Sequence, residues 1–421
     1  MDNWSVVVVG GGPAGLLAAC RAAARGRRTL LLEKNRRPGV KILISGGGHC
    51  NLTQATDARG IVKAFGPKGR FLHSALAALG PQQLVELIEA EGVRTEVEPG
   101  GKVFPASRLA RHVLDAVMRC FHRSGAKLAP EEPLVDLHRN KSGFRLVTSR
   151  RVLTAETVVL ASGGCSYPRC GTTGEGYRWV QELGHTIVSP RPALVPIVTD
   201  STWIAALQGI AVPDVLLTLV EGETRSTAGP AGLNREKPVE QRRGAILFAH
   251  FGLSGPVALD LSRAVSVRPR GQRPTLVCDF LPEIQERRLE EVLGEEASRS
   301  GRRHVASILE RWLPRRLADV LVVQACLAPE RRMAEISRPE RRRVVEAVKR
   351  LSIRTTGTLG FEKAEVTAGG VALEEVDSRT MQSNRVAGLF LAGELLDLDG
   401  PIGGYNLQAA FSTGYLAGEN A

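Results

Sequence analysis

The first residues with evident chemistry are three glycines near the start of the chain. Gly10, Gly12 and Gly15 follow the G-x-G-x-x-G spacing, and Glu33 lies about twenty residues further on. The first glycine permits a tight turn, the second lets a pyrophosphate reach N–H groups at a helix N-terminus, and the third lets the helix approach a strand. A carboxylate at position 33 can bind a ribose diol and disfavours a 2′-phosphate. The spacing predicts a dinucleotide site, with a purely structural glycine turn as the alternative.

A second stretch, "KILISGGGHCNLT" at residues 41–53, places three glycines in a row. Glycine costs conformational entropy on folding, so the triplet predicts backbone at positive φ or backbone that touches a large group. His49 and Cys50 come directly after it. These two residues, with Tyr167 after a later strand and His250 in "FAHFGLSGP", are the candidates for moving a proton. For each of them, a hydrogen-bonded structural side chain is the alternative.

The elements around these residues indicate a nucleotide-binding sheet. A strand of β-branched residues, a glycine turn, an alanine-rich helix and a second strand follow one another in "SVVVVGGGPAGLLAACRAAARGRRTLLLEK", which predicts a βαβ unit. The stretch "TVVLA", ended by Ser162, Gly163 and Gly164, predicts a further parallel strand whose carboxyl end adjoins the ligand. A surface turn is the alternative for these glycines.

The C-terminal segment favours FAD over NAD as the dinucleotide. There the strand "GLFLAG" leads into Glu394, a glycine-rich turn and a helix that starts near Asn406. In flavoproteins such a strand brings an acid to the ribitol, and the following helix start directs N–H dipoles at the pyrimidine edge of the flavin. A nicotinamide dehydrogenase needs no such closing element.

Composition predicts a globular protein. The chain has 421 residues, 43% hydrophobic and 24% charged, which suits roughly two to three domains. No stretch approaches the length of a membrane span, so we expect a cytoplasmic protein without a membrane partner. Seven cysteines without a CxxC pair predict reduced thiols and no metal site. Cys165 and Cys170 could form a redox dithiol, but the Tyr-Pro turn between them favours incidental thiols.

The chain is basic, with 56 Lys and Arg against 44 Asp and Glu, a net charge of +12. Such an excess favours polyanions or anionic substrates, although a high genomic G+C content would give the same arginine bias. Residues 283–350 hold 16 basic and 12 acidic residues, so we expect the excess to be spread along the chain. With 5% aromatic residues, any RNA contact would depend on the shape of the fold rather than on base stacking.

The chain resembles the BaiN-type, or aminoacetone oxidase-type, FAD-binding flavoproteins in six motifs that occur in the same order: "GVKILISGGGHCNLT", "GKVFPASRLARHVLDAV", "LASGGCSYPRCGTTGEGY", "FAHFGLSGPVALDL", "EKAEVTAGGVALEEV" and "AGELLDLDGPIGGYNLQAAFSTG". The resemblance implies an α/β fold, a glutathione-reductase-type FAD (Rossmann-like) domain with an insertion that roofs the flavin. We expect a discontinuous FAD domain at 1–192 and 352–421, an inserted β-rich subdomain at 193–282 and a small helical subdomain at 283–351. The Pro-rich "SPRPALVPIVTD" and the short strands and charged helices that follow it agree with these boundaries.

Carried over residue by residue, the resemblance implies contacts to non-covalent FAD. Each part of FAD would be bound by its own set of residues, and both ends of the chain would contribute to the flavin site. The sets are Gly10, Gly12, Ala14 and Gly15 at the pyrophosphate; Glu33 at the ribose, with Lys34 as a further cofactor contact; backbone of Val135 at adenine; Lys41, Ser45, Gly46, Gly47 and Asn51 beside the flavin; Ala161, Ser162 and Gly163 at the end of the third strand; and Gly393, Glu394, Gly403, Gly404, Asn406 and Leu407 at the ribitol and pyrimidine.

Two positions depart from the family pattern. The family usually has GGGRCN, and here His49 replaces the arginine, so a fixed charge gives way to one that titrates near neutrality. Cys165 stands where the family often has Lys before "SYP", and we have no physical account of this change. The first departure concerns the substrate side of the flavin.

Three functions fit these observations. The first is NAD(P)H-driven reduction of a polarised C=C bond, for which the resemblance implies either a steroid-like enone or a uridine of ribosomal RNA as the substrate; the basic charge favours RNA. NAD(P)H would bind only transiently, since the chain has no second G-x-G-x-x-G domain. The second is oxidation of a small amine such as aminoacetone, which an aromatic cage would assist and for which this chain has few aromatic residues. The third is a non-catalytic flavoprotein that binds RNA or a partner. The sequence does not distinguish NADH from NADPH or define the oligomeric state.

Overall fold

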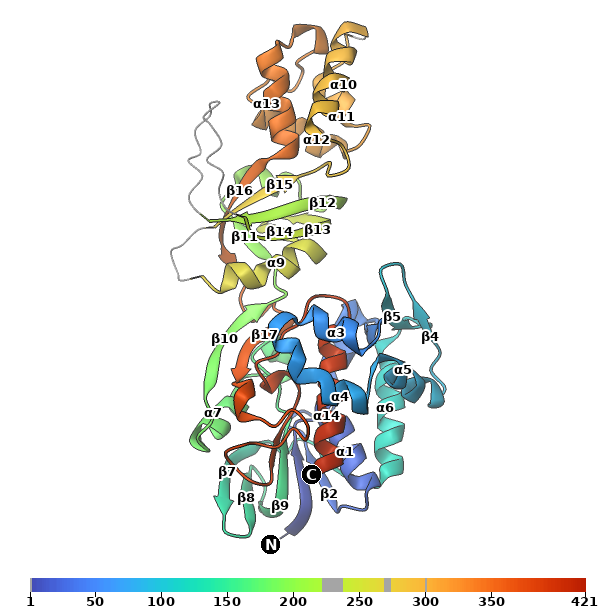
Figure 1. Ribbon diagram of the computed structural model, residues 1–421, viewed down its shortest axis with the longest axis vertical. Coiled ribbons are helices and arrows are strands. Elements are labelled where there is room, and N and C mark those ends of the chain that lie inside the picture. The colour runs from blue at the N-terminus through green and yellow to red at the C-terminus, as the bar shows by residue number, and fades with distance from the viewer. Residues whose placement is uncertain (1, 222–237, 269–273, 300) are drawn as a thin grey trace. The chain divides into compact units, whose positions relative to one another are not determined.

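The computed structural model describes residues 2–221, 238–268, 274–299 and 301–421, and the chain divides into two compact units (Figure 1). The sheet unit comprises Met1–Pro192 and Phe361–Ala421, and the barrel unit comprises Ala193–Gly360. The chain re-enters the sheet unit at Phe361, later than the boundary after residue 351 that we expected. The reason is β16 (Leu351–Thr358), which pairs with two barrel strands and so belongs to the barrel unit.

A seven-stranded sheet forms the centre of the sheet unit, in the order β6-β2-β1-β9-β8-β7 with β18 paired to β9. Strands β6, β2, β1, β9 and β18 are parallel, whereas β8 pairs antiparallel with both β9 and β7. This arrangement confirms the predicted mixed α/β fold and its βαβ unit. The strands are β1 (Asp2–Val9), β2 (Thr29–Leu32), β6 (Lys127–Ala129), β7 (Leu134–Asn140), β8 (Gly143–Thr148), β9 (Val152–Leu160) and β18 (Leu389–Leu391).

Helices and two small sheets surround this central sheet. The small sheets have the orders β3-β5-β4 and β10-β17. Their strands are β3 (Thr53–Gln54), β4 (Thr95–Val97), β5 (Lys102–Pro105), β10 (Ile187–Ala193) and β17 (Val366–Val371). The α-helices are α1 (Pro13–Ala24), α2 (Val40–Ile44), α3 (Ala58–Ala64), α4 (His73–Ala78), α5 (Pro81–Ala90), α6 (Ala110–Ser124), α7 (Glu175–Glu182) and α14 (Tyr405–Asn420). The 3₁₀ turns are η1 (Ser45–Gly48), η2 (Gly66–Leu72), η3 (Pro168–Cys170), η5 (Leu373–Glu375) and η6 (Gly393–Leu395).

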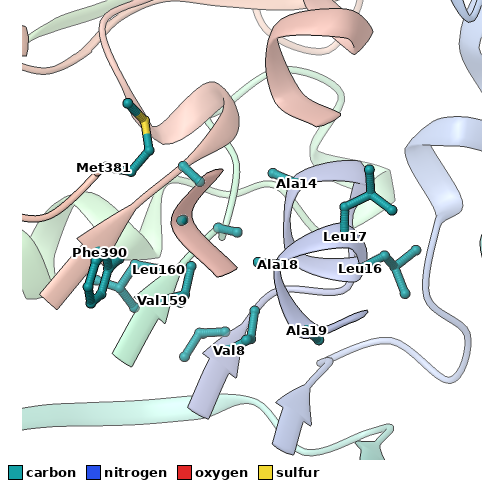
Figure 2. Packing of buried hydrophobic residues seen from close by; sticks show 14 of the residues in the cluster. Val8, Ala14, Leu16, Leu17, Ala18, Ala19, Val159, Leu160, Met381 and Phe390 are labelled. Carbon is teal, nitrogen blue, oxygen red and sulfur yellow. The ribbon is translucent and has the colours of Figure 1, made fainter. Parts of the chain in front are cut away.

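The helices from the two ends of the chain, α1 and α14, lie against each other with almost no side chain between them. A Cβ atom added to Gly414 would lie 2.6 Å from the Cα of Ala14, and one added to Gly418 would lie 2.8 Å from the Cα of Ala18. Figure 2 shows Ala14 and Ala18 on α1, with Leu16 and Leu17 on other faces of the same helix. Small residues on both helices thus allow the two backbones to touch.

The barrel unit contains a closed barrel in the order β11-β14-β13-β12-β15-β16. The remaining strands are β11 (Ile197–Thr199), β12 (Ala211–Val220), β13 (Pro238–Ala249), β14 (Gly252–Ser254) and β15 (Thr275–Asp279). The helices are α8 (Thr202–Ala205), α9 (Pro256–Ser266), α10 (Glu286–Arg299), α11 (Val305–Leu309), α12 (Arg315–Gln324), η4 (Met333–Glu335) and α13 (Arg338–Lys349). Barrel residues such as Leu276 and helix residues such as Leu289 share one hydrophobic core. Ion pairs such as Arg287–Glu291 lie on the outer faces of these helices.

Within the part of the chain that the structure describes, no helix combines the length and the apolar character that crossing a bilayer requires.

The contact between α1 and α14 leads to a test in which a normally stabilising substitution becomes destabilising. Gly→Ala inside a helix usually stabilises it by about 0.5–1 kcal/mol. We expect Gly414→Ala instead to lower the free energy of unfolding by about 1–3 kcal/mol, because the new methyl group overlaps the backbone of α1. Guanidinium unfolding, followed by circular dichroism, measures this change.

The matched control is Gly294→Ala in α10, where an added Cβ meets no atom within 4 Å. This variant should be as stable as the original chain or slightly more stable. Equal stability of Gly414→Ala and the original chain would show that the two helices do not touch as described.

Candidate functional site

The glycine-rich turn after β1 is shaped by its contact with the end of β9. A Cβ on Gly10 would lie 2.5 Å from the carbonyl oxygen of Ala161, and a Cβ on Gly15 would overlap the carbonyl group of Gly10. Gly12 differs from both, because a Cβ there would meet nothing within 4 Å. The first and third glycines therefore serve packing, whereas Gly12 borders open space at the start of α1.

Glu33 holds this turn from the end of β2. One carboxylate oxygen accepts a hydrogen bond from the N–H of Gly11 at 2.7 Å, and the other accepts one from the N–H of Asn35 at 2.7 Å. Burial raises the pKa of the Glu33 carboxyl above its ordinary value. The next residue, Lys34, pairs at 2.7 Å with Glu175. Glu33, which was predicted to bind a ribose, therefore also holds the glycine-rich turn in place.

The glycine triplet forms η1 and has positive φ at all three positions, 56° at Gly46, 68° at Gly47 and 89° at Gly48. Residues with a side chain rarely adopt such angles, so the backbone conformation itself requires glycine. Among the described residues, an added Cβ would come closer than 3 Å to another atom only at Gly46, where the backbone nitrogen of Asn51 lies 2.9 Å away. The triplet is therefore a left-handed turn, one of the two readings that the sequence allowed.

A polar cluster joins segments from the N-terminal, central and C-terminal parts of the sheet unit. The Nζ of Lys41 forms an ion pair with Glu394 and donates to the hydroxyl of Ser166 at 2.7 Å. Ser166 in turn donates to Glu394 at 2.5 Å, and the N–H of Thr367 donates to the same carboxylate at 2.9 Å. The Thr367 hydroxyl accepts from the backbone N–H of Cys165 and Ser166. Of these residues, Lys41 and Glu394 were predicted and the others were not.

The N-terminus of α14 lies against the segment that follows the triplet. Gly404 has φ of 91°, and an added Cβ would lie 2.5 Å from the carbonyl oxygen of Thr53. In the amide orientation that satisfies both of its groups, Asn51 accepts from the N–H of Gly404 at 3.0 Å and donates to the carbonyl of Thr53 at 3.1 Å. Gln408 on α14 accepts from the Thr53 hydroxyl at 2.6 Å. These contacts bring Asn51 and Gly404, both predicted at the flavin, into one place.

Three features of the chain fit a bound dinucleotide. Neither α1 nor α14 has a side-chain cap at its N-terminus, and neither has an acidic residue in its first turn. Helix N-termini of this kind favour anionic groups. Gly12 borders open space at the first of them. Ser162, at the end of β9, has a buried hydroxyl with no hydrogen-bond partner in the described residues.

The four candidates for proton transfer lie in different environments. His49 is exposed, and its Nδ1 lies 2.7 Å from the carbonyl oxygen of Arg108. Cys50 is fully buried, which raises the pKa of its thiol to about 11, so the thiol stays protonated near neutral pH. Tyr167 is partly buried with φ of 56°, and its N–H donates to Phe361. His250 is exposed in the barrel unit. Of these four residues, only His49 both follows the glycine triplet directly and has an exposed ring.

Other predicted contacts are occupied by the chain itself. The side chain of Asn406 accepts from the N–H of Gly400 at 2.8 Å and donates to its carbonyl at 3.0 Å, so it binds the preceding loop. The carbonyl of Val135, on a bulge of β7, accepts from Arg178 and Trp179. The remaining predicted residues line the same turns: Ser45 donates to Ile42, Gly163 has φ of 77°, the N–H of Gly393 donates to Thr413, and Leu407 packs against the main core.

Ser166 and Thr367 are the residues of this site that sequence reasoning missed. Both lie inside stretches that carry the family resemblance, "CSYPRC" and "EVTAGG". The presence of a hydroxyl in such a stretch was the available signal for a partner of Glu394. Nothing local indicates that these two, about 200 residues apart, share one carboxylate.

A buried Ser–His–Glu arrangement occurs elsewhere in the sheet unit. The Nδ1 of His185 lies 3.0 Å from Glu375, and its Nε2 lies 2.8 Å from the hydroxyl of Ser383. All three residues are buried, and the Ser383 oxygen also accepts from the backbone N–H of Arg385 and Val386. A nucleophile needs an exposed oxygen, so the arrangement is a structural connection rather than a hydrolase site.

Comparison with known proteins supports a Rossmann-type nucleotide site in this chain. Residues 4–420 match the family described as HI0933-like protein Rossmann domain. The chain is 28% identical to the ribosomal RNA dihydrouridine synthase of Escherichia coli, over all of this chain and 98% of that protein. It is 29% identical to the protein of that name from Haemophilus influenzae, over 97% of this chain and 96% of that protein.

Two further similarities concern reductases. The chain is 29% identical to the 3-dehydro-bile acid delta(4,6)-reductase of Clostridium scindens, over 98% of both chains. Among solved structures, the open conformation of a flavocytochrome c3 fumarate reductase has a TM-score of 0.51 at 16% identity, covering all of this chain and 78% of that one. This last likeness shows the fold alone.

The ion pair between Lys41 and Glu394 can be tested by a double substitution. Lys41→Met should lower the free energy of unfolding by about 2–4 kcal/mol and reduce retained FAD, because it leaves the largely buried Glu394 without its cation. Adding Glu394→Gln to this variant should restore part of the loss, since it removes the unpaired charge. Urea unfolding and the FAD content after gel filtration measure both effects.

The matched control is Arg111→Met, which removes one partner of the exposed pair with Asp115 on α6. It should change the free energy of unfolding by about 0–1 kcal/mol. An effect of Lys41→Met no larger than that of the control would contradict the role given to the pair.

The buried His185–Glu375 pair predicts a loss of stability in acid. A hydrogen bond from Arg385 lowers the pKa of Glu375 from 4.5 to about 2, so its stabilising effect is complete above about pH 4.5 and is lost as the pH falls toward 2. Burial lowers the pKa of His185 below its ordinary 6.5, which adds a loss of the same sign below pH 6.5. Glu375→Gln should therefore destabilise the protein near neutral pH, with a difference from the original chain that narrows toward about pH 3.

Urea unfolding across this pH range measures the difference. Glu374→Gln, at the exposed neighbouring position, should leave the pH dependence unchanged. A pH-independent difference for Glu375→Gln would contradict the assignment.

Proposed function

Because the chain belongs to the HI0933-like Rossmann family of FAD-binding oxidoreductases, we propose that it reduces a polarised C=C bond and that this bond is the C5=C6 bond of a uridine in ribosomal RNA. The observation that carries the proposal is similarity over nearly the whole chain to two proteins named ribosomal RNA dihydrouridine synthase, at 28% and 29% identity. The basic composition of the chain supports an RNA substrate.

The reaction requires one hydride and one proton, and the chain needs to supply only the proton and the positioning. FAD, when bound, would supply the hydride from N5, with NAD(P)H as the proposed source of the electrons. The chain has no second G-x-G-x-x-G motif for a resident nicotinamide, so we propose that NAD(P)H binds transiently. The residues of the polar cluster around Glu394 would bind the ribitol side of FAD, and the left-handed turn at Gly46–Gly48 would lie beside its ring.

His49 is the side chain that we propose as the proton donor. A carbonyl oxygen only accepts hydrogen bonds, so the Nδ1 that lies 2.7 Å from Arg108 carries its proton. The Nε2 of the same exposed ring faces no carbonyl partner in the described residues; it can give a proton to the substrate when the ring is doubly protonated, and the neutral ring with its proton on Nδ1 is what remains. The arginine usual at this position in the family would offer a fixed charge in its place.

A second candidate substrate is a small enone. It is favoured by the equally close similarity to a bile acid reductase, 29% identical over the full chain. If a steroid enone is the substrate, adding it without RNA to the purified protein and NAD(P)H should oxidise the NAD(P)H, which is measured as a loss of its absorbance. This measurement distinguishes the two substrates.

The proposal is tested by the dihydrouridine content of ribosomal RNA. Mass spectrometry of RNA from cells that lack the gene should show the loss of one dihydrouridine, and the original gene should restore it. A gene encoding His49→Gln should restore it slowly, because a positioned proton donor contributes about 10²-fold or more to the rate.

The matched control is His112→Gln, which alters another exposed histidine whose Nδ1 lies 2.8 Å from the hydroxyl of Ser107. This gene should restore the modification fully. Undiminished dihydrouridine in cells without the gene would rule out ribosomal RNA as the substrate.

A further inference from the structure

The basic excess of the chain is concentrated in one segment, which corrects the even spread that we expected. Residues 34–85 hold eight Lys and Arg against one acidic residue, Asp57, for a net charge of +7 out of +12. From residue 58 to residue 85 there is no Asp or Glu. Residues 283–350 account for +4, so the remainder of the chain is nearly neutral.

Part of this charge is already compensated within the sheet unit. Lys34 pairs with Glu175, Lys41 pairs with Glu394, and Lys68 pairs at 2.6 Å with Asp397. Asp57, the one acid of the segment, caps α3 by accepting from the N–H of Gly60. It therefore serves the helix rather than the neighbouring cations.

The other three cations of α3 and η2 are different, and we call Arg59, Lys63 and Arg70 the basic strip. All three side chains are exposed. Arg59 and Lys63 are four residues apart on α3 and so lie on one face, while Ile61 between them is buried. Within the described residues, no carboxylate forms an ion pair with any of the three. The exposed His73 follows at the start of α4.

The segment that carries the basic strip is fixed to the loop that leads into α14. Lys68 of η2 pairs with Asp397, and the oxygen of Asp399 lies 3.7 Å away; both aspartates are buried. The ring of Phe65, between α3 and η2, lies so close to Gly400 that an added Cβ would be 2.8 Å from it. From Gly400 the chain runs to the Gly403–Gly404 turn, where α14 begins. The segment that carries the basic strip therefore lies against the loop before the Gly403–Gly404 turn, where the pyrimidine end of the flavin is predicted.

We propose that the basic strip binds the phosphate backbone of RNA next to the uridine that enters the flavin site. This inference rests on the function proposed above and names the surface that recognises its substrate. A base inside structured RNA must be extruded before an enzyme can act on it, and the flanking phosphates must then be held. Exposed, unpaired cations provide that contact without reading sequence. A steroid-sized substrate would need no such surface.

The test compares two variants with the same change in net charge. Arg59→Gln/Lys63→Gln/Arg70→Gln neutralises the basic strip. Lys141→Gln/Arg145→Gln/Arg150→Gln neutralises three exposed cations at and around β8, in another part of the same unit. The probes are a fluorescent oligouridylate and protein-free bacterial ribosomal RNA, each titrated with the FAD-loaded protein at several salt concentrations.

We expect the strip variant to bind both RNAs at least about tenfold more weakly, and the slope of log affinity against log salt to fall by about 2, as three lost phosphate contacts imply for a single strand. The control variant should bind nearly as the original protein does. Both variants should retain FAD, its visible spectrum and its reduction by NAD(P)H, which shows that they are folded. Arg59→Lys/Arg70→Lys, which keeps the charge, should keep most of the affinity.

Equal losses in the strip and control variants would overturn the inference, because they would show a general effect of net charge. Undiminished binding by the strip variant would also overturn it, and the proposed function would stand if the original protein still forms dihydrouridine. An original protein that binds neither RNA and forms no dihydrouridine would remove both proposals together.

Discussion

The direct backbone contact between α1 and α14 is the constraint on which the rest of the sheet unit depends. These helices come from opposite ends of the chain, and Gly414 and Gly418 let one backbone lie on Ala14 and Ala18 of the other. Because no long side chain stands between them, neither helix can slide without steric overlap. The contact therefore fixes where two uncapped helix N-termini lie relative to each other, one at the Gly10–Gly15 turn and one at Gly404. FAD would suit such a frame, with its anionic pyrophosphate at one helix start and, at the other, a flavin ring that becomes anionic on reduction.

Polar contacts join the loops between these two helix starts, in addition to the hydrophobic packing of residues such as Leu52 and Leu395. Glu394 accepts from Lys41, Ser166 and Thr367, which come from three separate parts of the chain. Asn51 connects the segment after the glycine triplet to Gly404 in the same way. A partly buried carboxylate with three donors is stable only when all of them are in place. The polar cluster can thus form only after both ends of the chain have come together.

Local patterns made much of this arrangement predictable from the sequence. The spacing of Gly10, Gly12 and Gly15 and the triplet at Gly46–Gly48 express backbone requirements that act over a few residues, and a single chain is enough to reveal them. The closed barrel was not predictable, because its closure depends on the pairing of Ile197 with Thr358, residues far apart in sequence. For the same reason the partners of Glu394 and the His185–Glu375 pair escaped notice. Asn406 was predicted to bind the cofactor, whereas in the structure its side chain binds its own preceding loop.

Charge in the sheet unit is of two kinds, and the difference bears on function. The cations Lys34, Lys41 and Lys68 each have a carboxylate partner, so they join segments of the chain and add little to the external field. Arg59, Lys63 and Arg70 lie in the same segment without such partners in the described residues, and their field extends into solvent over about one Debye length, roughly 8–10 Å at physiological salt. Exposed cations without carboxylate partners are what a surface for an anionic partner requires beside a site whose own charges are satisfied.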